Sequence, residues 1–69
     1  MNLTKKAIKE MTNEELMSSL LWNTVRSTNE LNTRGGVTQQ TRKEERYLME
    51  EVSNRFNLDL DVLIAKMNP

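Results

Sequence analysis

The side chains that most often do acid–base or nucleophilic chemistry are missing from this chain. It contains no histidine and no cysteine, so it lacks the common general base at neutral pH, a thiolate nucleophile, and imidazole or thiolate metal ligands. The hydroxyls of Ser18, Ser19, Ser27 and Ser53 have no evident activating partner in the sequence. We therefore expect a protein that is not an enzyme, with no catalytic residue, no cofactor and no metal site.

Two other patterns resemble sites without having the required spacing. The adjacent glutamates Glu14-Glu15, Glu44-Glu45 and Glu50-Glu51 would point about 100° apart on a helix, and we interpret all three pairs as solvated faces. Gly35-Gly36 precedes a predicted helix start, but the lysine and the spacing of a phosphate-binding loop are absent. We interpret the two glycines as a turn.

Binding is the remaining kind of chemistry, and two aromatic side chains indicate where it would occur. Trp22 lies roughly 150° from the centre of the apolar stripe of its predicted helix, and Tyr47 also lies off the apolar face of a later helix. Tryptophan, tyrosine and arginine dominate binding hot spots, and basic residues accompany both rings. The predicted partner-binding residues are Trp22, Arg26, Tyr47, Lys43, Arg42 and Arg46.

The two rings also have a purely structural interpretation. Trp22 and Tyr47 could pack under the N-terminal turn or the C-terminal helix, in which case neither would be available to a partner. We predict instead that at least one of them is solvent-accessible.

The basic residues alone do not favour nucleic acid as the partner. Lysine plus arginine and aspartate plus glutamate number 10 each, for a net charge of zero, whereas nucleic-acid-binding domains are usually basic. Glu44 and Glu45 interrupt the group around Arg42, and a second group lies at Lys5, Lys6 and Lys9, with Arg34 between them. A nucleic-acid-associated factor is therefore the alternative function.

These residues are carried by what we expect to be an all-α fold. The longest predicted helix spans residues 12–32, because Thr12 and Glu15 have the spacing of a capping box and Met11 and Leu16 that of a hydrophobic staple. Its apolar stripe recurs at helical intervals. The stripe comprises Leu16, Met17, Leu20, Leu21, Thr24, Val25, Thr28 and Leu31.

A second long helix is predicted over residues 38–57. Thr38 is the preferred cap and Thr41 the rival start, Glu51 and Arg55 form a favourable i,i+4 pair, and Asn57 stops the helix in the left-handed conformation. Because the connection through Gly35-Gly36 is short, the two long helices should form an antiparallel hairpin, 12–57.

Short helices flank this hairpin within a single domain, 1–69. Thr4 caps one over residues 4–10, and Asp59 caps another over residues 59–67. The last segment lies across the open end of the hairpin or is donated to a second subunit. The predicted core is Leu20, Leu21, Val25, Leu48, Val52 and Phe56.

A chain of 69 residues supports only a small core and depends on good helix packing or oligomerisation. Since the apolar stripes are broad and a hairpin has one seam, we favour a homodimer that forms a four-helix-like bundle. The alternative is a monomer in which residues 3–10 and 58–67 close the core. We also expect no membrane association and a cytoplasmic protein, since no apolar run approaches membrane-spanning length and no signal peptide is evident.

Two segments carry a resemblance to known families. Thr12-Asn-Glu-Glu-Leu16 and Arg46-Tyr-Leu-Met-Glu-Glu-Val-Ser-Asn-Arg-Phe-Asn-Leu58 resemble small helical proteins of phages and prophages in low-GC Gram-positive bacteria, over most of residues 11–58. They are also similar to the Sda family of helical-hairpin inhibitors of a sensor histidine kinase. The chain departs from that family in its longer second helix, its Gly-Gly loop and its extra terminal helices.

The resemblance implies a small regulator, such as an inhibitor, that binds a host protein in the host cytoplasm. We expect this binding to use the outer faces of the two long helices. Protein binding is therefore the predicted function, as the aromatic residues also indicate. The alternatives are the nucleic-acid-associated factor and a self-assembling structural subunit.

Overall fold

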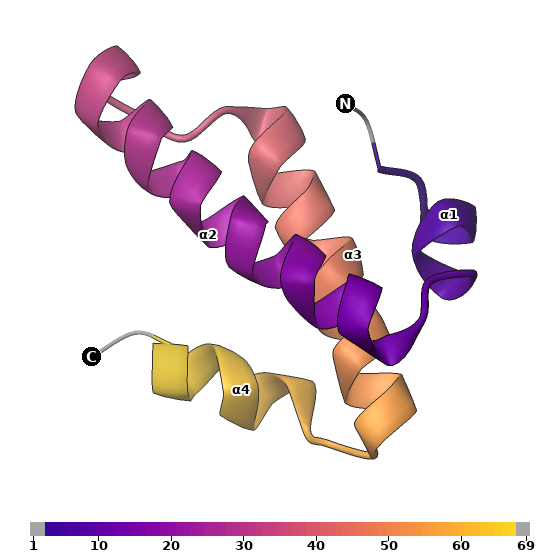
Figure 1. The fold of residues 1–69 in the computed structure, drawn as a ribbon. Helices are drawn as coiled ribbons and strands as arrows, with labels where there is room; N and C mark the ends of the chain where they lie inside the picture. The colour runs from indigo at the N-terminus through magenta and orange to yellow at the C-terminus, as the bar shows by residue number, and fades with distance from the viewer. Residues whose placement is uncertain (1–2, 68–69) are drawn as a thin grey trace.

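The computed structural model describes residues 3–67, which form four helices and no strand. The two long helices, α2 and α3, pack together, and Figure 1 shows the chain turning back between them while α1 and α4 lie at the sides. In chain order the helices are α1 (Lys5–Lys9), α2 (Asn13–Arg34), α3 (Gln39–Phe56) and α4 (Leu60–Met67). The prediction of an all-α fold is confirmed for these residues.

Helix α1 is a single short turn that a distant arginine stabilises. Thr4 caps its start by accepting a hydrogen bond from the Ala7 N–H at 3.1 Å. At its other end the Arg55 guanidinium donates to the carbonyl oxygens of Met11 at 2.7 Å and of Ile8 at 3.3 Å. A cation is favourable at a helix C-terminus, so Arg55 of α3 stabilises the end of α1.

Helix α2 begins with the predicted capping box. The Thr12 hydroxyl accepts from the Glu15 N–H at 3.1 Å, and the Glu15 carboxylate accepts from the Thr12 N–H at 2.9 Å. These hydrogen bonds lower the pKa of Glu15, and the bond from the Thr12 N–H has the largest effect. The helix ends at Gly35, whose φ of 76° is the left-handed conformation that glycine adopts without strain. It therefore continues to Arg34, beyond the predicted end at residue 32.

The caps of α3 and α4 are also those expected from the sequence. The Thr38 hydroxyl accepts from the Thr41 N–H, which confirms Thr38 over Thr41 as the cap of α3. Asn57 ends α3 with a φ of 56°, and Asp59 accepts from the Asp61 and Val62 N–H groups at the start of α4. Local hydrogen bonds and backbone preferences thus account for the start and end of α3 and the start of α4.

The core lies where α1 covers the two long helices. Its buried apolar cluster contains Ile8 from α1, Leu16 from α2, and Leu48 and Val52 from α3. Leu20 is half-buried and packs against this cluster. The prediction is therefore right for Leu48 and Val52 and near right for Leu20.

Three predicted core residues lie at the surface instead. Leu21, Val25 and Phe56 are 67%, 47% and 42% exposed, respectively. The side of α2 that carries Leu16 and the polar Asn23 is buried instead. Ile8 of α1 is buried in the core, where the prediction placed residues of the apolar stripe of α2. The stripe expected to form the hairpin seam thus remains uncovered.

Helix α4 packs against α3. Its Leu60 and Leu63 side chains are half-buried, whereas Val62 and Ile64 are exposed. Residues 68 and 69 of the predicted domain 1–69 lie outside the described residues. Among residues 3–67, none of the helices combines the length with the apolar character needed to cross a membrane.

Candidate functional site

The predicted binding residues lie in three places: two lie on one surface, three lie on another, and Tyr47 is packed against α1. Trp22 and Arg26 lie together on α2, and Arg42, Lys43 and Arg46 lie together on α3. Tyr47 lies against α1. The sequence grouping around Tyr47 is therefore divided in space.

Trp22 stands beside a groove between α2 and the N-terminal segment, and 70% of its surface is exposed. The groove has a volume of about 360 Å³. Leu3 and Met11 supply apolar walls, and Ser18 and Ser19 supply hydroxyls. The full lining is Leu3, Met11, Ser18, Ser19, Trp22, Asn23, Arg26 and Glu44. The prediction that at least one ring is solvent-accessible is confirmed by Trp22.

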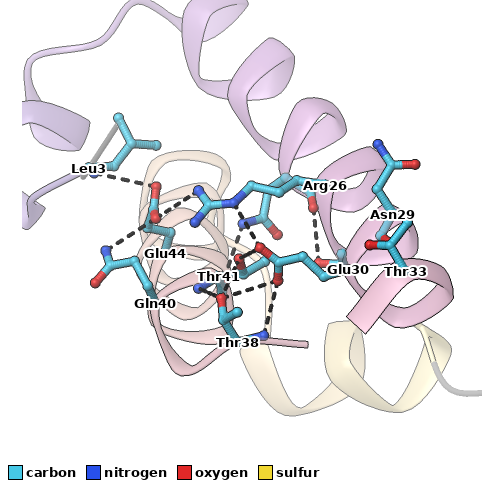
Figure 2. A network of polar contacts seen from close by, with 11 residues as sticks. Leu3, Arg26, Asn29, Glu30, Thr33, Thr38, Gln40, Thr41 and Glu44 are labelled. Atoms are coloured by element: carbon cyan, nitrogen blue, oxygen red, sulfur yellow. Dashed lines mark hydrogen bonds and ion pairs between the residues drawn. The ribbon is translucent and has the colours of Figure 1, made fainter. Parts of the chain in front are cut away.

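Arg26 lies between two carboxylates and is not a free cation (Figure 2). Its Nη1 donates to Glu44 Oε2 at 3.0 Å, and its Nε donates to Glu30 Oε2 at 3.3 Å. Partial burial by itself lowers the pKa of Arg26, but these hydrogen bonds and charges raise it overall. The positive rim expected beside Trp22 is therefore neutralised by α2 and α3 themselves.

The same two carboxylates connect three parts of the chain (Figure 2). Glu30 of α2 accepts from the Thr38 N–H at 3.0 Å and from the Thr41 hydroxyl at 2.8 Å, at the start of α3. Glu44 of α3 accepts from the Leu3 N–H at 3.3 Å, beside its pair with Arg26. We call Arg26, Glu30, Thr38, Thr41 and Glu44 the polar network. It fixes the first turn of α3 against α2.

Glu44 corrects the interpretation of the paired glutamates as solvated faces, because only 2% of it is exposed. Its place on the buried face has a sequence signal: Glu44 precedes Leu48 by four residues, the spacing of side chains on one helix face. The prediction did not use this spacing, because Glu44 is charged and adjoins Glu45. The buried oxygens are tolerated since the polar network supplies donors.

Asn23 is a second buried polar residue that the sequence reasoning missed. Its Nδ2 donates to the Thr41 carbonyl oxygen at 3.1 Å, whereas its Oδ1 has no hydrogen-bond partner within residues 3–67. Asn23 thus occupies a position in the α2–α3 interface that an apolar residue usually fills.

The contacts of the polar network lower the pKa of the Glu30 carboxyl. The Thr38 N–H is the largest cause that lowers the pKa of Glu30, to about 2, against a partial desolvation that raises it. The Thr41 and Thr38 hydroxyls and Arg26 lower it further. Glu30 is therefore ionised in the folded protein over the whole ordinary pH range.

This shift predicts a loss of stability in acid. The unfolded chain takes up a proton at Glu30 near the ordinary pKa of 4.5, whereas the folded protein does so only near 2. The stabilisation is thus complete above about pH 4.5 and is lost as the pH falls toward 2. We expect the difference in Tm between wild type and Glu30→Gln to narrow over this interval. A constant difference in thermal scans would contradict the assignment.

Tyr47 follows the structural interpretation that was considered for both rings. It is half-buried and packs against the core cluster. The Lys5 ammonium of α1 lies 5.1 Å from the centre of its ring, within the range of a cation–π contact. Tyr47 therefore contributes mainly to holding α1 in place.

The three basic residues of α3 line a wider groove between α3 and α4, with a volume of about 650 Å³. Glu45 and Asp61 line the same groove, and Arg46 pairs with Glu50 at 3.2 Å. Its lining is Gln39, Gln40, Arg42, Lys43, Glu45, Arg46, Met49, Leu60, Asp61 and Ile64. This is a mixed-charge surface, with less attraction for phosphate than three unopposed cations would have.

Two of the serine hydroxyls that the sequence left without an activating partner take structural roles. The Ser27 and Ser53 hydroxyls donate to the carbonyl oxygens of Asn23 and Met49, one turn earlier. Over residues 3–67, no three carboxylates gather closely enough to hold a metal ion. What these residues offer is a surface with an exposed tryptophan and a polar-edged groove.

Comparison with known proteins assigns this chain to no family. No family model matches it, and no curated protein or solved structure matches it either. Its function is therefore inferred from its own surfaces.

Proposed function

We propose that this protein is a non-enzymatic interaction module that binds a second protein through the groove beside Trp22. The observation that carries the proposal is the 70% exposure of Trp22 at the edge of that groove. A large aromatic ring held in water leaves apolar area uncovered, and burying such a ring is a main source of energy at protein interfaces.

The chemistry of the groove supports a polypeptide segment as the ligand. Leu3, Met11 and Trp22 offer apolar contacts, and the Ser18 and Ser19 hydroxyls lie among them. Because Glu30 and Glu44 already neutralise Arg26, the groove has no unopposed cation that would select a phosphate or a carboxylate. An apolar side chain flanked by hydrogen-bonding backbone fits this lining.

The biological role that we propose is that of a phage or mobile-element regulator acting on a host protein in the cytoplasm. The resemblance of residues 11–58 to small phage and prophage proteins supports this role. Masking a functional surface of the host protein is the simplest mode of action for a module without catalytic groups. In the same proposal the α2–α3 pair is a helical hairpin that self-associates into a four-helix-like bundle.

Trp22→Ala is expected to weaken partner binding by about tenfold or more, since hot-spot truncation costs about 2 kcal/mol or more. The measurement is affinity capture from a nuclease-treated Gram-positive lysate, followed by titration of the recovered protein. The exposed Trp22 ring contributes little to folding, so the helical circular dichroism should not change.

The double charge reversal Arg42→Glu with Lys43→Glu is the matched control. It alters the exposed α3 side chains and should leave capture intact. Loss of capture with the charge reversal but not with Trp22→Ala would refute the proposed site and favour the α3–α4 groove.

A further inference from the structure

An uncharged stripe runs along the outer face of α2, apart from the groove beside Trp22. We call it the α2 stripe: Met17, Leu21, Thr24, Val25, Thr28 and Leu31, all exposed. At about 100° per residue these positions share one side of the helix. Trp22 follows Leu21 and is therefore turned by about 100° toward the groove. The stripe is a second surface.

The two threonines of the α2 stripe do not make it polar. The Thr24 hydroxyl donates to the Leu20 carbonyl oxygen and the Thr28 hydroxyl to that of Thr24, both at 3.1 Å. Each hydroxyl donor is satisfied within the helix, so covering the stripe strands no donor. Removing the stripe from water therefore carries no larger desolvation cost than removing an apolar surface.

The area of the protein indicates how much surface is available to be covered. The chain has an accessible surface of 5307 Å², whereas a compact folded monomer of 8.1 kDa exposes roughly 4,500 Å². The excess of about 800 Å² is close to what one partner buries in an interface of standard size. The fully buried apolar cluster, by contrast, contains only Ile8, Leu16, Leu48 and Val52.

The absence of charge on the α2 stripe favours a second copy as the occupant. In a two-fold dimer the same patch of both copies meets, so a charged stripe would bring like charges together. The α2 stripe contains no charged residue and avoids this repulsion. The chain also has zero net charge, and the copies therefore do not repel. A different partner would need no such neutrality.

We propose that a second copy of this chain covers the α2 stripe, with the two α2 helices antiparallel and crossing at Thr24. Thr24 is the midpoint, seven residues from both Met17 and Leu31, so the two-fold axis places Met17 of one copy beside Leu31 of the other. The small Thr24 side chain at the crossing lets the helices approach closely. This arrangement specifies the self-association within the proposed function and leaves the groove beside Trp22 free.

The first test is sedimentation of wild type and Leu21→Glu across a wide range of concentration. Wild type should sediment at twice the 8.1 kDa of the chain, and Leu21→Glu should sediment as the monomer at concentrations at least tenfold higher. Leu21 is 67% exposed in the single chain, so the glutamate does not disturb the core. A wild type of monomer mass at high micromolar concentration, or a Leu21→Glu variant that remains dimeric, would overturn the proposal.

The second test uses the absence of cysteine from the chain. Thr24→Cys places one thiol beside its copy at the two-fold axis, and mild oxidation should yield a covalent dimer. Asn29→Cys, on the same helix but outside the stripe, is the matched control and should cross-link at least tenfold more slowly. Equal rates would exclude the crossing at Thr24.

These outcomes are separable from failure of the partner site. Trp22→Ala should remain dimeric in sedimentation while losing the captured partner. If wild type is a monomer but Trp22→Ala still abolishes capture, the self-association fails and the proposed partner site beside Trp22 stands. If the dimer forms through Thr24 but no protein depends on Trp22, only the partner site fails.

Discussion

Leu48→Ala is expected to destabilise the folded state by about 2–5 kcal/mol, the cost of emptying a buried leucine site. Leu48 is 0% exposed and belongs to the cluster formed by α1, α2 and α3. Because a core of this size rarely supplies more than about 3–5 kcal/mol, much of the variant should be unfolded at 25 °C. Urea titration followed by far-ultraviolet circular dichroism measures the change.

Leu58→Ala is the matched control for Leu48→Ala, since it makes the same chemical change at a side chain that is 47% exposed. We expect it to cost below about 1 kcal/mol, because half of the leucine already contacts water. Leu58 lies outside the α2 stripe, so its removal does not affect the proposed dimer. Equal losses for the two variants would mean that the cluster around Leu48 is not the core.

Glu44→Gln is expected to cost about 1–3 kcal/mol, because it removes the charge that accepts hydrogen bonds from three parts of the chain. Its Oε2 accepts from Arg26 and Gln40, and its Oε1 accepts from the Leu3 N–H. A glutamine can keep only some of these bonds. We place the effect below that of a fully buried ion pair, since the Arg26 side chain is 32% exposed and partly screened. Thermal unfolding at neutral pH measures it.

Glu45→Gln is the control that tests the burial argument. Glu45 adjoins Glu44 in the sequence, but it is only half-buried. Surface substitutions of this kind usually stay within about 0.5 kcal/mol. A larger loss for Glu45→Gln than for Glu44→Gln would contradict the arrangement of the polar network.

The sequence by itself determined where the helices of residues 3–67 begin and where α3 ends, whereas α2 continues to Arg34, two residues beyond its predicted end. Thr4, Thr12, Thr38 and Asp59 cap the four starts, and Gly35 and Asn57 adopt the left-handed conformation at two ends. Each of these features depends on hydrogen bonds or backbone preferences within a few residues. Local chemistry suffices for them, and the i,i+4 pair of Glu51 with Arg55 formed for the same reason.

The exposure of Trp22 was predicted from its position off the apolar stripe of α2, but that reason does not hold, because the stripe is itself exposed. Trp22 is exposed as expected, whereas the same reasoning failed for Tyr47, which α1 and Lys5 cover. Periodicity shows which side of a helix a residue occupies. It does not show which distant segment will pack there.

Only the tertiary structure decided which face of α2 is buried and which partners the charges have. Leu21 and Val25 were expected in the core, yet the helix is rotated so that Leu16 and Asn23 are buried. Arg26 pairs with Glu44 across eighteen residues, and Arg55 reaches the carbonyls of α1 across more than forty. Such contacts depend on how whole helices pack against each other, which no local pattern along the chain encodes.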